Sequence, residues 1–282
     1  MLAAWAYFVL TFFGHHALYH PARHPEGPWN LQHSLQAEDV WLAAADGVRI
    51  HGWFVPPVSQ TPAAGNSQGE GGETADAGQE IVTLYLHGNA GNISHRADKL
   101  SALAQAGSAI RIIDYRGFGK SDGSPKEAGL YLDADAAYAE LSRRGYRADR
   151  IFLYGESLGT GVAADLAARQ PCAGVVLEAP FPSAGTVANR VIPLLGPLVV
   201  SGFETSRKIA QVRIPLLIIH GNRDEVIPYD LGQAVFEAAN EPKRFWTIEG
   251  GHHNDLVQVA GPEFSKRLGE FFSKARGLAW RK

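Results

Sequence analysis

The stretch Ile151-Phe-Leu-Tyr-Gly-Glu-Ser-Leu-Gly-Thr-Gly161 decides the fold. Its first four residues are β-branched, aromatic or large and aliphatic, which is typical of a buried strand. Good helix formers follow Leu158, so Ser157 stands between a strand and a helix with a glycine two residues to each side. This is the Gly-x-Ser-x-Gly pattern of a nucleophile elbow, in which glycines leave room for a sharp turn and a helix N-terminus faces the serine. The pattern alone also fits a glycine-rich loop with an inert serine. A nucleophilic role for Ser157 therefore requires a base and an acid elsewhere in the chain.

Composition describes an ordinary globular chain. It has 282 residues, of which 45% are hydrophobic and 20% are charged, and its net charge is −3. No long basic run is present, so nothing indicates a nucleic-acid partner. Cys172 is the only cysteine, which excludes an intramolecular disulfide and a cysteine-rich metal site.

The order of strands and helices predicts an α/β fold. Short, nearly continuous apolar runs suit strands buried on both faces, and they occupy residues 81–86, 110–114, 151–154, 174–178 and 215–219; residues 243–248 are expected to form a last strand. Helical patterns lie between most of these runs and after the last, at 93–106, 126–144, 158–169, 231–239 and 262–275. Residues 39–45 and 48–55 alternate around Asp46-Gly47, which predicts an antiparallel hairpin. We therefore expect a doubly wound, mostly parallel sheet of eight strands.

Two segments stand apart from this pattern. Residues 1–14 contain no charged side chain, but the apolar run is shorter than the roughly 20 residues that span a bilayer. We expect residues 1–30 to form a tail or membrane anchor before a catalytic domain at 31–282, with membrane association through residues 1–19; an apolar helix packed on the protein is the alternative. Apart from the membrane, the domain would be cytoplasmic or periplasmic. Residues 58–80 have the composition of a disordered loop within the domain.

A nucleophilic serine needs a base and an acid. In open α/β sheets such groups gather at the carboxyl ends of the strands. Asp224 follows the strand at 215–219, with Glu225 as the nearest competitor, and His252 and His253 follow the last strand. Serine, then acid, then histidine is a recurrent chain order for this chemistry. We therefore predict Ser157, Asp224 and one of the two histidines as a catalytic triad.

Backbone N–H groups should stabilise the negative charge that forms on the attacked carbonyl oxygen. One candidate is the N–H of Leu158, directly after the serine. The other is the N–H of Asn89, in the loop His87-Gly-Asn-Ala-Gly-Asn92 that follows the strand at 81–86. His87 precedes this loop immediately, which favours a structural role for it over that of a base.

Taken together, these motifs resemble the α/β-hydrolase superfamily. The matching residues are His87–Gly91, Asp114–Gly123, Gly155–Thr160, His220–Pro228 and His253–Asp255, and the resemblance spans about residues 39–275. The chain is similar to small-cap serine hydrolases related to membrane-anchored acyl-protein thioesterases and monoacylglycerol lipases. The resemblance implies a short cap at residues 181–212, an apolar segment that suits one wall of an acyl pocket or a surface facing lipid; ordinary packing against the sheet is the alternative. The resemblance also favours His253 over His252 as the base, because the family's histidine directly precedes Asn-Asp.

These observations predict a serine hydrolase that cleaves a small-molecule carboxylic ester or thioester through an acyl-enzyme. Ser157 would attack, His253 would accept its proton, and Asp224 would orient the imidazole. Neither metal nor cofactor is needed for this chemistry. A peptidase or amidase with the same triad, an acyltransferase, and a non-catalytic binding module remain as alternatives.

Overall fold

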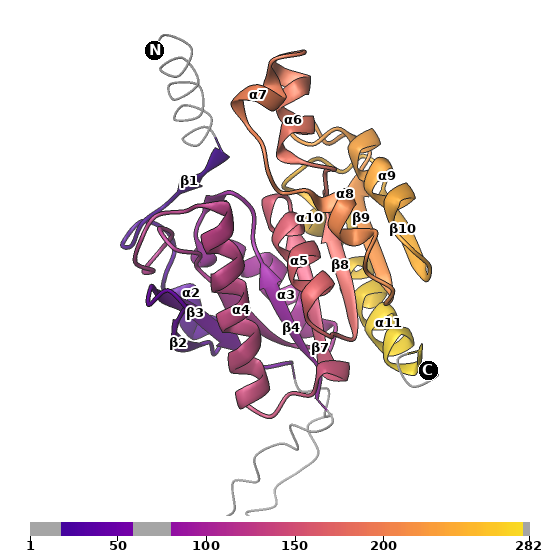
Figure 1. Ribbon diagram of the computed structural model, residues 1–282. Helices are drawn as coiled ribbons and strands as arrows, with labels where there is room; N and C mark the ends of the chain where they lie inside the picture. The colour runs from indigo at the N-terminus through magenta and orange to yellow at the C-terminus, as the bar shows by residue number, and fades with distance from the viewer. Residues whose placement is uncertain (1–17, 59–79, 279–282) are drawn as a thin grey trace, which may run out of the picture.

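An eight-stranded sheet forms the centre of the molecule (Figure 1). The computed structural model describes residues 18–58 and 80–278, so the predictions for residues 1–17 and 59–79 lie outside the described part. The strand order is β10-β9-β8-β7-β4-β6-β3-β2. β3 pairs antiparallel with both β2 and β6 and every other pair is parallel, so seven of the eight strands share one direction. In chain order the strands of this sheet are β2 (Glu38–Ala43), β3 (Arg49–Val55), β4 (Val82–Leu86), β6 (Ala109–Ile113), β7 (Ile151–Glu156), β8 (Gly174–Glu178), β9 (Leu216–Gly221) and β10 (Lys243–Ile248).

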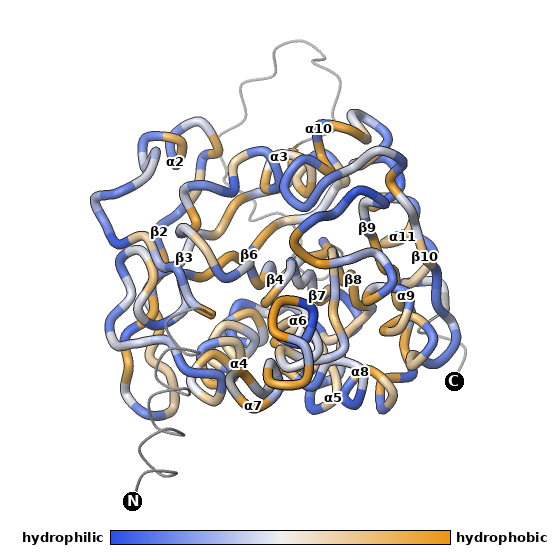
Figure 2. The backbone as a smooth tube through the Cα atoms, turned by 90° about the horizontal axis from the view of Figure 1, so that it is seen from above, coloured by the Kyte–Doolittle hydropathy of each residue, from blue (hydrophilic) through white to orange (hydrophobic). Residues whose placement is uncertain are grey.

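Helices cover both faces of the sheet, and Figure 2 shows the two layers from above. One face carries α4 (Glu127–Arg143), α5 (Leu158–Arg169), α8 (Thr205–Ile209) and α9 (Tyr229–Ala238). The other carries α3 (Ala97–Gln105), α10 (Leu256–Ala260) and α11 (Pro262–Leu278). Side chains alternate along each strand, so that Ile151 and Leu153 of β7 enter the first core while Phe152 and Tyr154 enter the second. This double burial explains why the strands are continuous apolar runs in the sequence.

The mostly parallel sheet of eight strands confirms the predicted fold class. The hairpin around Asp46-Gly47 forms as β2 and β3. The helix predicted at 93–106 instead divides into a 3₁₀ turn, η1 (Ile93–Arg96), and α3. The division follows from local hydrogen bonds, since the Asn92 side chain accepts from the Ser94 N–H at 3.0 Å and the Asp114 carboxylate accepts from the Ile93 N–H at 3.0 Å.

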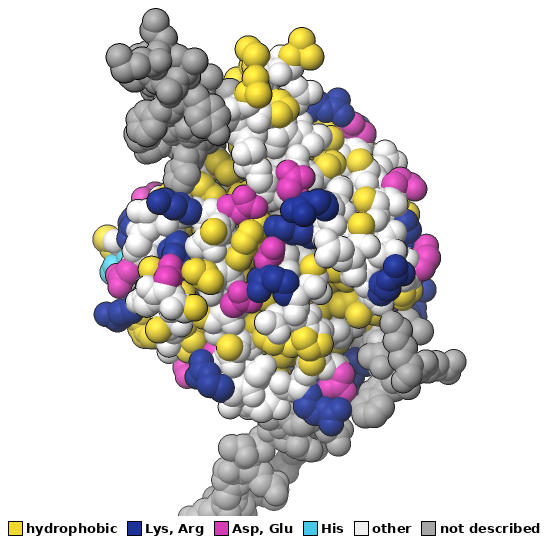
Figure 3. All heavy atoms as spheres, in the orientation of Figure 1, with side chains coloured by type: hydrophobic (Ala, Val, Ile, Leu, Met, Phe, Trp, Pro, Cys, Tyr) yellow, Lys and Arg dark blue, Asp and Glu magenta, His cyan; other side chains and the backbone are white. Residues whose placement is uncertain are grey.

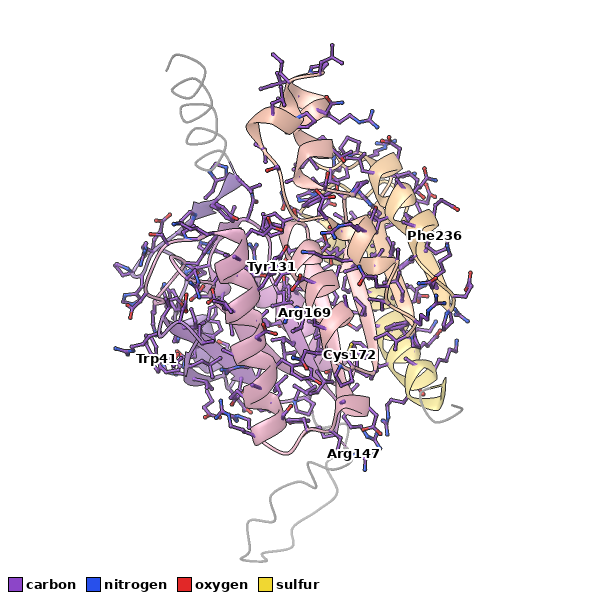
Figure 4. The ribbon with its side chains drawn as sticks, in the orientation of Figure 1. Trp41, Tyr131, Arg147, Arg169, Cys172 and Phe236 are labelled. Atoms are coloured by element: carbon purple, nitrogen blue, oxygen red, sulfur yellow. The ribbon has the colours of Figure 1, made fainter. Side chains whose placement is uncertain are left out.

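Short elements complete the described chain. They are β1 (His20–Pro21), α2 (Leu31–Ser34), β5 (Ala90–Gly91), η2 (Ala148–Arg150), α6 (Ala184–Val191) and α7 (Gly196–Val199). Helices α4 and α5 are joined by Arg169, which lies between them in Figure 4 and binds Asp135 at 2.9 Å and Asp165 at 2.6 Å. Cys172 follows α5 and is buried, and burial raises the pKa of its thiol to about 12.

The segment between β8 and β9 carries α6 and α7 above the carboxyl edge of the sheet, and α8 then returns to the face that α5 covers. Ser183 begins α6, and its Oγ accepts from the Thr186 N–H at 3.2 Å. Large apolar side chains project from the turn between α6 and α7, and they gather at the tip of the molecule in Figure 3. We call them the apolar crest, and their exposed fractions are Val191 78%, Ile192 44%, Leu194 88%, Leu195 57% and Leu198 63%. Among residues 18–58 and 80–278, no helix combines the length and apolarity that crossing a membrane requires.

Candidate active site

Ser157 lies at the sharp turn from β7 to α5. Its backbone angles are φ 50° and ψ −117°, which a residue other than glycine adopts only when the surrounding structure enforces them. A Cβ on Gly159 would lie 1.9 Å from the Leu86 carbonyl oxygen, and one on Gly155 would lie 2.6 Å from the Gly159 carbonyl oxygen. Both distances are far below contact, so the turn can form only with glycine at these two positions. The turn places the Ser157 side chain, which is largely buried, against a cavity at the carboxyl edge of the sheet.

A chain of hydrogen bonds joins Ser157, His253 and Asp224. The Ser157 Oγ is 3.1 Å from Nε2 of His253, and Nδ1 of His253 is 2.7 Å from Oδ2 of Asp224. The other carboxylate oxygen of Asp224 accepts from the backbone N–H groups of Val226 and Ile227 at 2.9 and 2.8 Å. Asp224 belongs to the loop after β9 and His253 to the loop after β10, so three strand ends meet at this point. The geometry therefore allows the proton of Ser157 to pass to a histidine held by a fixed carboxylate.

The charges of the pair are set by their surroundings. Burial alone raises the pKa of Asp224, but hydrogen bonds from His220 and His253 outweigh it and hold that pKa well below its ordinary value. Burial likewise lowers the pKa of His253, but Asp224 outweighs it and raises that pKa above the ordinary histidine value. Asp224 is thus a carboxylate at neutral pH, and it stabilises a protonated His253.

His220 contributes to this site, although sequence reasoning assigned it no role. Its Nε2 lies 3.4 Å from Oδ2 of Asp224 and 2.9 Å from the Ile227 carbonyl oxygen. Its side chain is fully buried, and it holds the loop that carries the carboxylate. The signal in the sequence was its position at the end of β9, four residues before Asp224.

His252 and Glu225 lie outside the hydrogen-bond chain. Nδ1 of His252 is 2.8 Å from a carboxylate oxygen of Glu225, and the two side chains are 48% and 63% exposed. The His252 N–H also donates to the Asp255 carboxylate at 2.7 Å. The two neighbouring histidines therefore point to different surroundings, one to the serine and one to solvent.

Both residues predicted to bind the oxyanion, Asn89 and Leu158, line a cavity together with Ser157. Their roles as N–H donors stay predictions. His87 is fully buried beneath this loop, and its Nδ1–H donates to the Gly88 carbonyl at 2.7 Å. Burial is the main cause that lowers the pKa of His87 to about 4, so this imidazole is neutral at pH 7.

One buried carboxylate, Glu178, and one partly buried carboxylate, Glu156, flank Ser157, and sequence reasoning missed both. Glu178 at the end of β8 accepts from Lys99 Nζ at 2.6 Å and from the Tyr154 hydroxyl, and its carbonyl accepts the Ser157 N–H at 2.8 Å. Glu156 accepts from the Tyr85 hydroxyl and lies 3.9 Å from Arg96 Nε. Burial opposes its ionisation, but Arg96 and Lys99 keep the pKa of Glu156 well below its ordinary value. The turn at Ser157 therefore packs against two ion pairs, Glu178 with Lys99 and Glu156 with Arg96.

The cavity at Ser157 has a volume of about 410 Å³ and is almost entirely apolar. Asn89 and Ser157 are its only polar lining residues among those described; the others are Leu18, Leu158, Phe181, Ala184, Val187, Ala188, Val191, Ile192, Val200, Val226 and Ile227. A larger cavity of about 890 Å³ lies along β10 and α11, and it contains none of the triad residues. Of these two cavities, the smaller one combines the triad serine with an apolar lining.

Comparisons with known proteins agree with this architecture. Residues 79–207 match the family model described as serine aminopeptidase, S33. The uncharacterized protein YfhR of Escherichia coli K12 is 35% identical over 251 residues, which cover 87% of this chain and 78% of that protein. Alpha/beta hydrolase domain-containing protein 17B of Xenopus laevis is 36% identical over 197 residues, covering 69% of this chain and 67% of that protein.

Solved structures share the fold at lower identity. The Pyrococcus furiosus esterase Pf2001 superimposes with a TM-score of 0.68 at 21% identity, over 91% of this chain and 98% of the esterase. An α/β-hydrolase from Vibrio vulnificus gives a TM-score of 0.72 at 18% identity, over 93% of each chain. The chain belongs to the α/β-hydrolase superfamily, in the branch that includes alpha/beta hydrolase domain-containing protein 17B.

Proposed function

We propose that this hydrolase cleaves carboxylic esters or thioesters with an apolar acyl group. The observation that carries the proposal is the hydrogen-bond chain from Asp224 through His253 to Ser157, which opens into the apolar cavity of about 410 Å³. A cavity of this size suits a small molecule.

The reaction would proceed in two halves. The Ser157 Oγ attacks the carbonyl carbon while its proton passes to Nε2 of His253, and the carboxylate of Asp224 stabilises the imidazolium. The tetrahedral intermediate then collapses, the proton passes from Nε2 to the leaving oxygen or sulfur, and an acyl-enzyme remains. Water attacks the acyl-enzyme with His253 as base, and the carboxylic acid leaves as Ser157 regains its proton. The N–H groups of Asn89 and Leu158 would hold the oxyanion in both halves, and a single donor of this kind is worth about 3–4 kcal/mol.

The lining of the cavity disfavours the peptidase alternative. An aminopeptidase must bind a charged α-ammonium group, which requires a carboxylate or a set of carbonyl acceptors close to the scissile bond. No described carboxylate lines this cavity, and the Asp224 side chain is fully buried behind His253. An uncharged acyl chain meets no such penalty.

A comparison of substrates tests the proposal. Purified protein would be assayed with p-nitrophenyl esters of increasing chain length, an S-acyl thioester, and aminoacyl p-nitroanilides with a free amino group. We expect turnover of the ester and thioester and none of the anilides. Cleavage of the anilides alone would replace the proposal with the peptidase. Absence of turnover together with absence of fluorophosphonate labelling would replace it with the binding module.

Val187 offers a test of where the acyl chain lies. Its side chain lines the cavity, so Val187→Phe should fill the space that the end of a long chain would occupy. Each buried methylene contributes about 0.8 kcal/mol, or about fourfold in kcat/KM. We expect the chain-length optimum to shorten by at least two carbons while kcat/KM for the acetate ester stays within about twofold. Val187→Ala is the matched control and should keep or lengthen the optimum; an unchanged optimum in Val187→Phe would place the acyl chain elsewhere.

The apolar crest favours a substrate presented at a lipid surface. Val191 and Ile192 belong both to the crest and to the cavity lining, so the crest continues into the mouth of the cavity. Leu18 lines the same cavity and directly follows the uncharged N-terminal segment. Exposed apolar patches of this kind mark interaction sites. We therefore propose that the crest and residues 1–19 face a membrane together.

The double variant Leu194→Asp/Leu198→Asp tests this orientation. Leu194 has φ 69°, a conformation that aspartate adopts more readily than leucine, so the fold should tolerate the change. We expect hydrolysis of a long-chain ester in phosphatidylcholine vesicles to fall about tenfold or more, and that of a dispersed short ester to stay within about twofold. Val259→Asp on α10, at a site 44% exposed in the native protein, is the control. Equal losses on both substrates would contradict the role of the crest.

A further inference from the structure

Residues 18–24 run beside the loop that carries Asn89, and we call them the N-terminal strap. Within the strap, β1 pairs in parallel with β5 of that loop. The His20 N–H donates to the Asn89 carbonyl at 2.8 Å, and the Ala22 N–H donates to the Gly91 carbonyl at 3.0 Å. The Asn89 side chain in turn donates through Nδ2 to the Leu18 carbonyl at 3.0 Å. The Asn92 side chain also donates through Nδ2 to the Ala22 carbonyl at 3.2 Å, so four hydrogen bonds join the strap and the loop.

The strap is also fixed on its far side, to the turn at residues 117–123. The Gly119 N–H donates to the Ala22 carbonyl at 2.9 Å, and the His24 N–H donates to the Gly119 carbonyl at 3.0 Å. The Arg23 guanidinium donates to the carbonyls of Ser121 and Gly123 at 3.0 and 2.8 Å. The strap therefore lies between the turn at residues 117–123 and the loop that carries Asn89, and it anchors the loop to that turn.

Two side chains hold the inner side of the loop: the His87 imidazole donates to the Gly88 carbonyl at 2.7 Å, and the Arg96 guanidinium donates to the Ala90 carbonyl at 2.5 Å. Neither of these bonds involves Asn89. Gly88 and Gly91 have no side chain to pack, Gly91 has φ 77°, and Ala90 between them is exposed. Asn89 binds the strap through two of its groups: its backbone carbonyl accepts from His20, and its side-chain Nδ2 donates to Leu18. The orientation of the Asn89 backbone therefore depends on the strap.

We propose that the N-terminal strap is a positioning element of the active site, which holds Asn89 so that its N–H faces the oxyanion. This inference rests on the proposed function, because it concerns the same carbonyl chemistry. It assigns catalytic importance to a segment that lies about 70 residues before the loop along the chain, and that lies outside the residues matched by the family model, 79–207. Catalysis should then depend on the backbone N–H of His20 more than on the His20 side chain.

His20→Pro tests the strap by deleting one hydrogen-bond donor. Proline removes the N–H that binds the Asn89 carbonyl, and an extended residue on a short edge strand is a position that proline tolerates. His20→Ala is the matched control, since it removes the side chain and keeps the N–H. Complete loss of one oxyanion donor costs about 10²–10³ in kcat, so a misplaced donor should cost about tenfold or more. We expect KM to stay within about twofold, because the ground-state substrate does not use the oxyanion donor.

Two further measurements keep the result interpretable. Affinity for a trifluoromethyl ketone, which forms an oxyanion on Ser157, should fall in parallel with kcat in His20→Pro. Hydrogen–deuterium exchange of a peptide covering residues 86–94 should be faster in His20→Pro than in His20→Ala, at equal thermal stability. Asn89→Ala, which keeps the backbone N–H but loses the bond to Leu18, should change kcat and exchange in the same direction. If His20→Pro proves unfolded, this variant carries the test.

The outcomes separate the strap from the proposed function. Wild-type protein that hydrolyses no ester or thioester refutes the proposed function, and the exchange measurement still reports whether the strap holds the loop. The proposed role of the strap is refuted by a different result. In that result the wild type is active, and His20→Pro and Asn89→Ala both show the same kcat and the same exchange rate as His20→Ala. A fall in kcat with no change in ketone affinity would likewise refute it, because a misplaced oxyanion donor must weaken both.

Discussion

Ser157→Ala should lower kcat for ester hydrolysis by about 10⁶ and abolish covalent labelling by a fluorophosphonate. Removing the nucleophile of a triad leaves only the contribution of the oxyanion donors and of substrate binding, which is why a single change costs about as much as removing the whole triad. The strained turn is imposed by Gly155, Gly159 and the strands around it, so the alanine side chain should not disturb it. We expect the thermal midpoint to change by less than about 3 °C. The measurement is kcat with the best p-nitrophenyl ester, alongside labelling and a thermal melt.

Ser265→Ala on α11 is the matched control, because Ser265 lies on the far face of the sheet, where its Oγ approaches only the Gln105 side chain at 3.4 Å. It should retain labelling and turnover. The double variant Ser157→Ala/His253→Ala should be no worse than either single variant, since the two residues act as one unit. Labelling that persists in Ser157→Ala would show that another residue is the nucleophile.

The sheet was predictable because its signals are local. Strands buried on both faces give continuous apolar runs, and β7 shows this in the sequence from Ile151 to Tyr154. The elbow is equally local, since Gly155 and Gly159 lie within two residues of Ser157. Asp224 could be placed because the end of a parallel strand is a fixed point of the fold. Each of these features depends on a few residues that are close together in the sequence.

The remaining features depend on pairs of polar groups far apart in the chain. Lys99 and Glu178 are separated by 79 residues, and nothing periodic in the sequence links a lysine on a helix to a carboxylate at a strand end. The strap is harder still to predict, because β1 has only two residues and its bonds to the loop are formed by the backbone. Backbone hydrogen bonds of this kind leave no trace in residue type.

His252 and His253 illustrate the same limit at short range. The two residues are adjacent and chemically identical, so only the path of the backbone after β10 decides which imidazole meets the serine. The structure turns His253 inward, with 10% of its side chain exposed, and leaves His252 beside Glu225 at 48% exposed. The preference for His253 in the sequence came from a family resemblance and not from the local pattern.

His253→Ala should lower kcat by about 10⁶, whereas His252→Ala should leave it within about twofold. His253 is 3.1 Å from the Ser157 Oγ and is the only described base within hydrogen-bond reach of it. His252 pairs with the Glu225 carboxylate, and both side chains are exposed. An exposed ion pair contributes little to the stability of a protein. Both variants would be assayed beside wild type with the same ester. An inactive His252→Ala beside an active His253→Ala would reverse the assignment of the base.

The pH profile supplies an independent check of the same residue. Only the neutral imidazole can accept the serine proton, so kcat/KM should fall as the pH drops through the pKa of His253. Burial lowers that pKa, but Asp224 outweighs burial and raises it, so the fall should begin at a higher pH than an ordinary histidine would give. Asp224→Asn removes the stabilising charge and should move the midpoint to lower pH while reducing kcat. Glu225→Gln is the matched control, because its partner is His252, and it should leave the midpoint in place. A midpoint that moves with Glu225 and not with Asp224 would identify His252 as the titrating base.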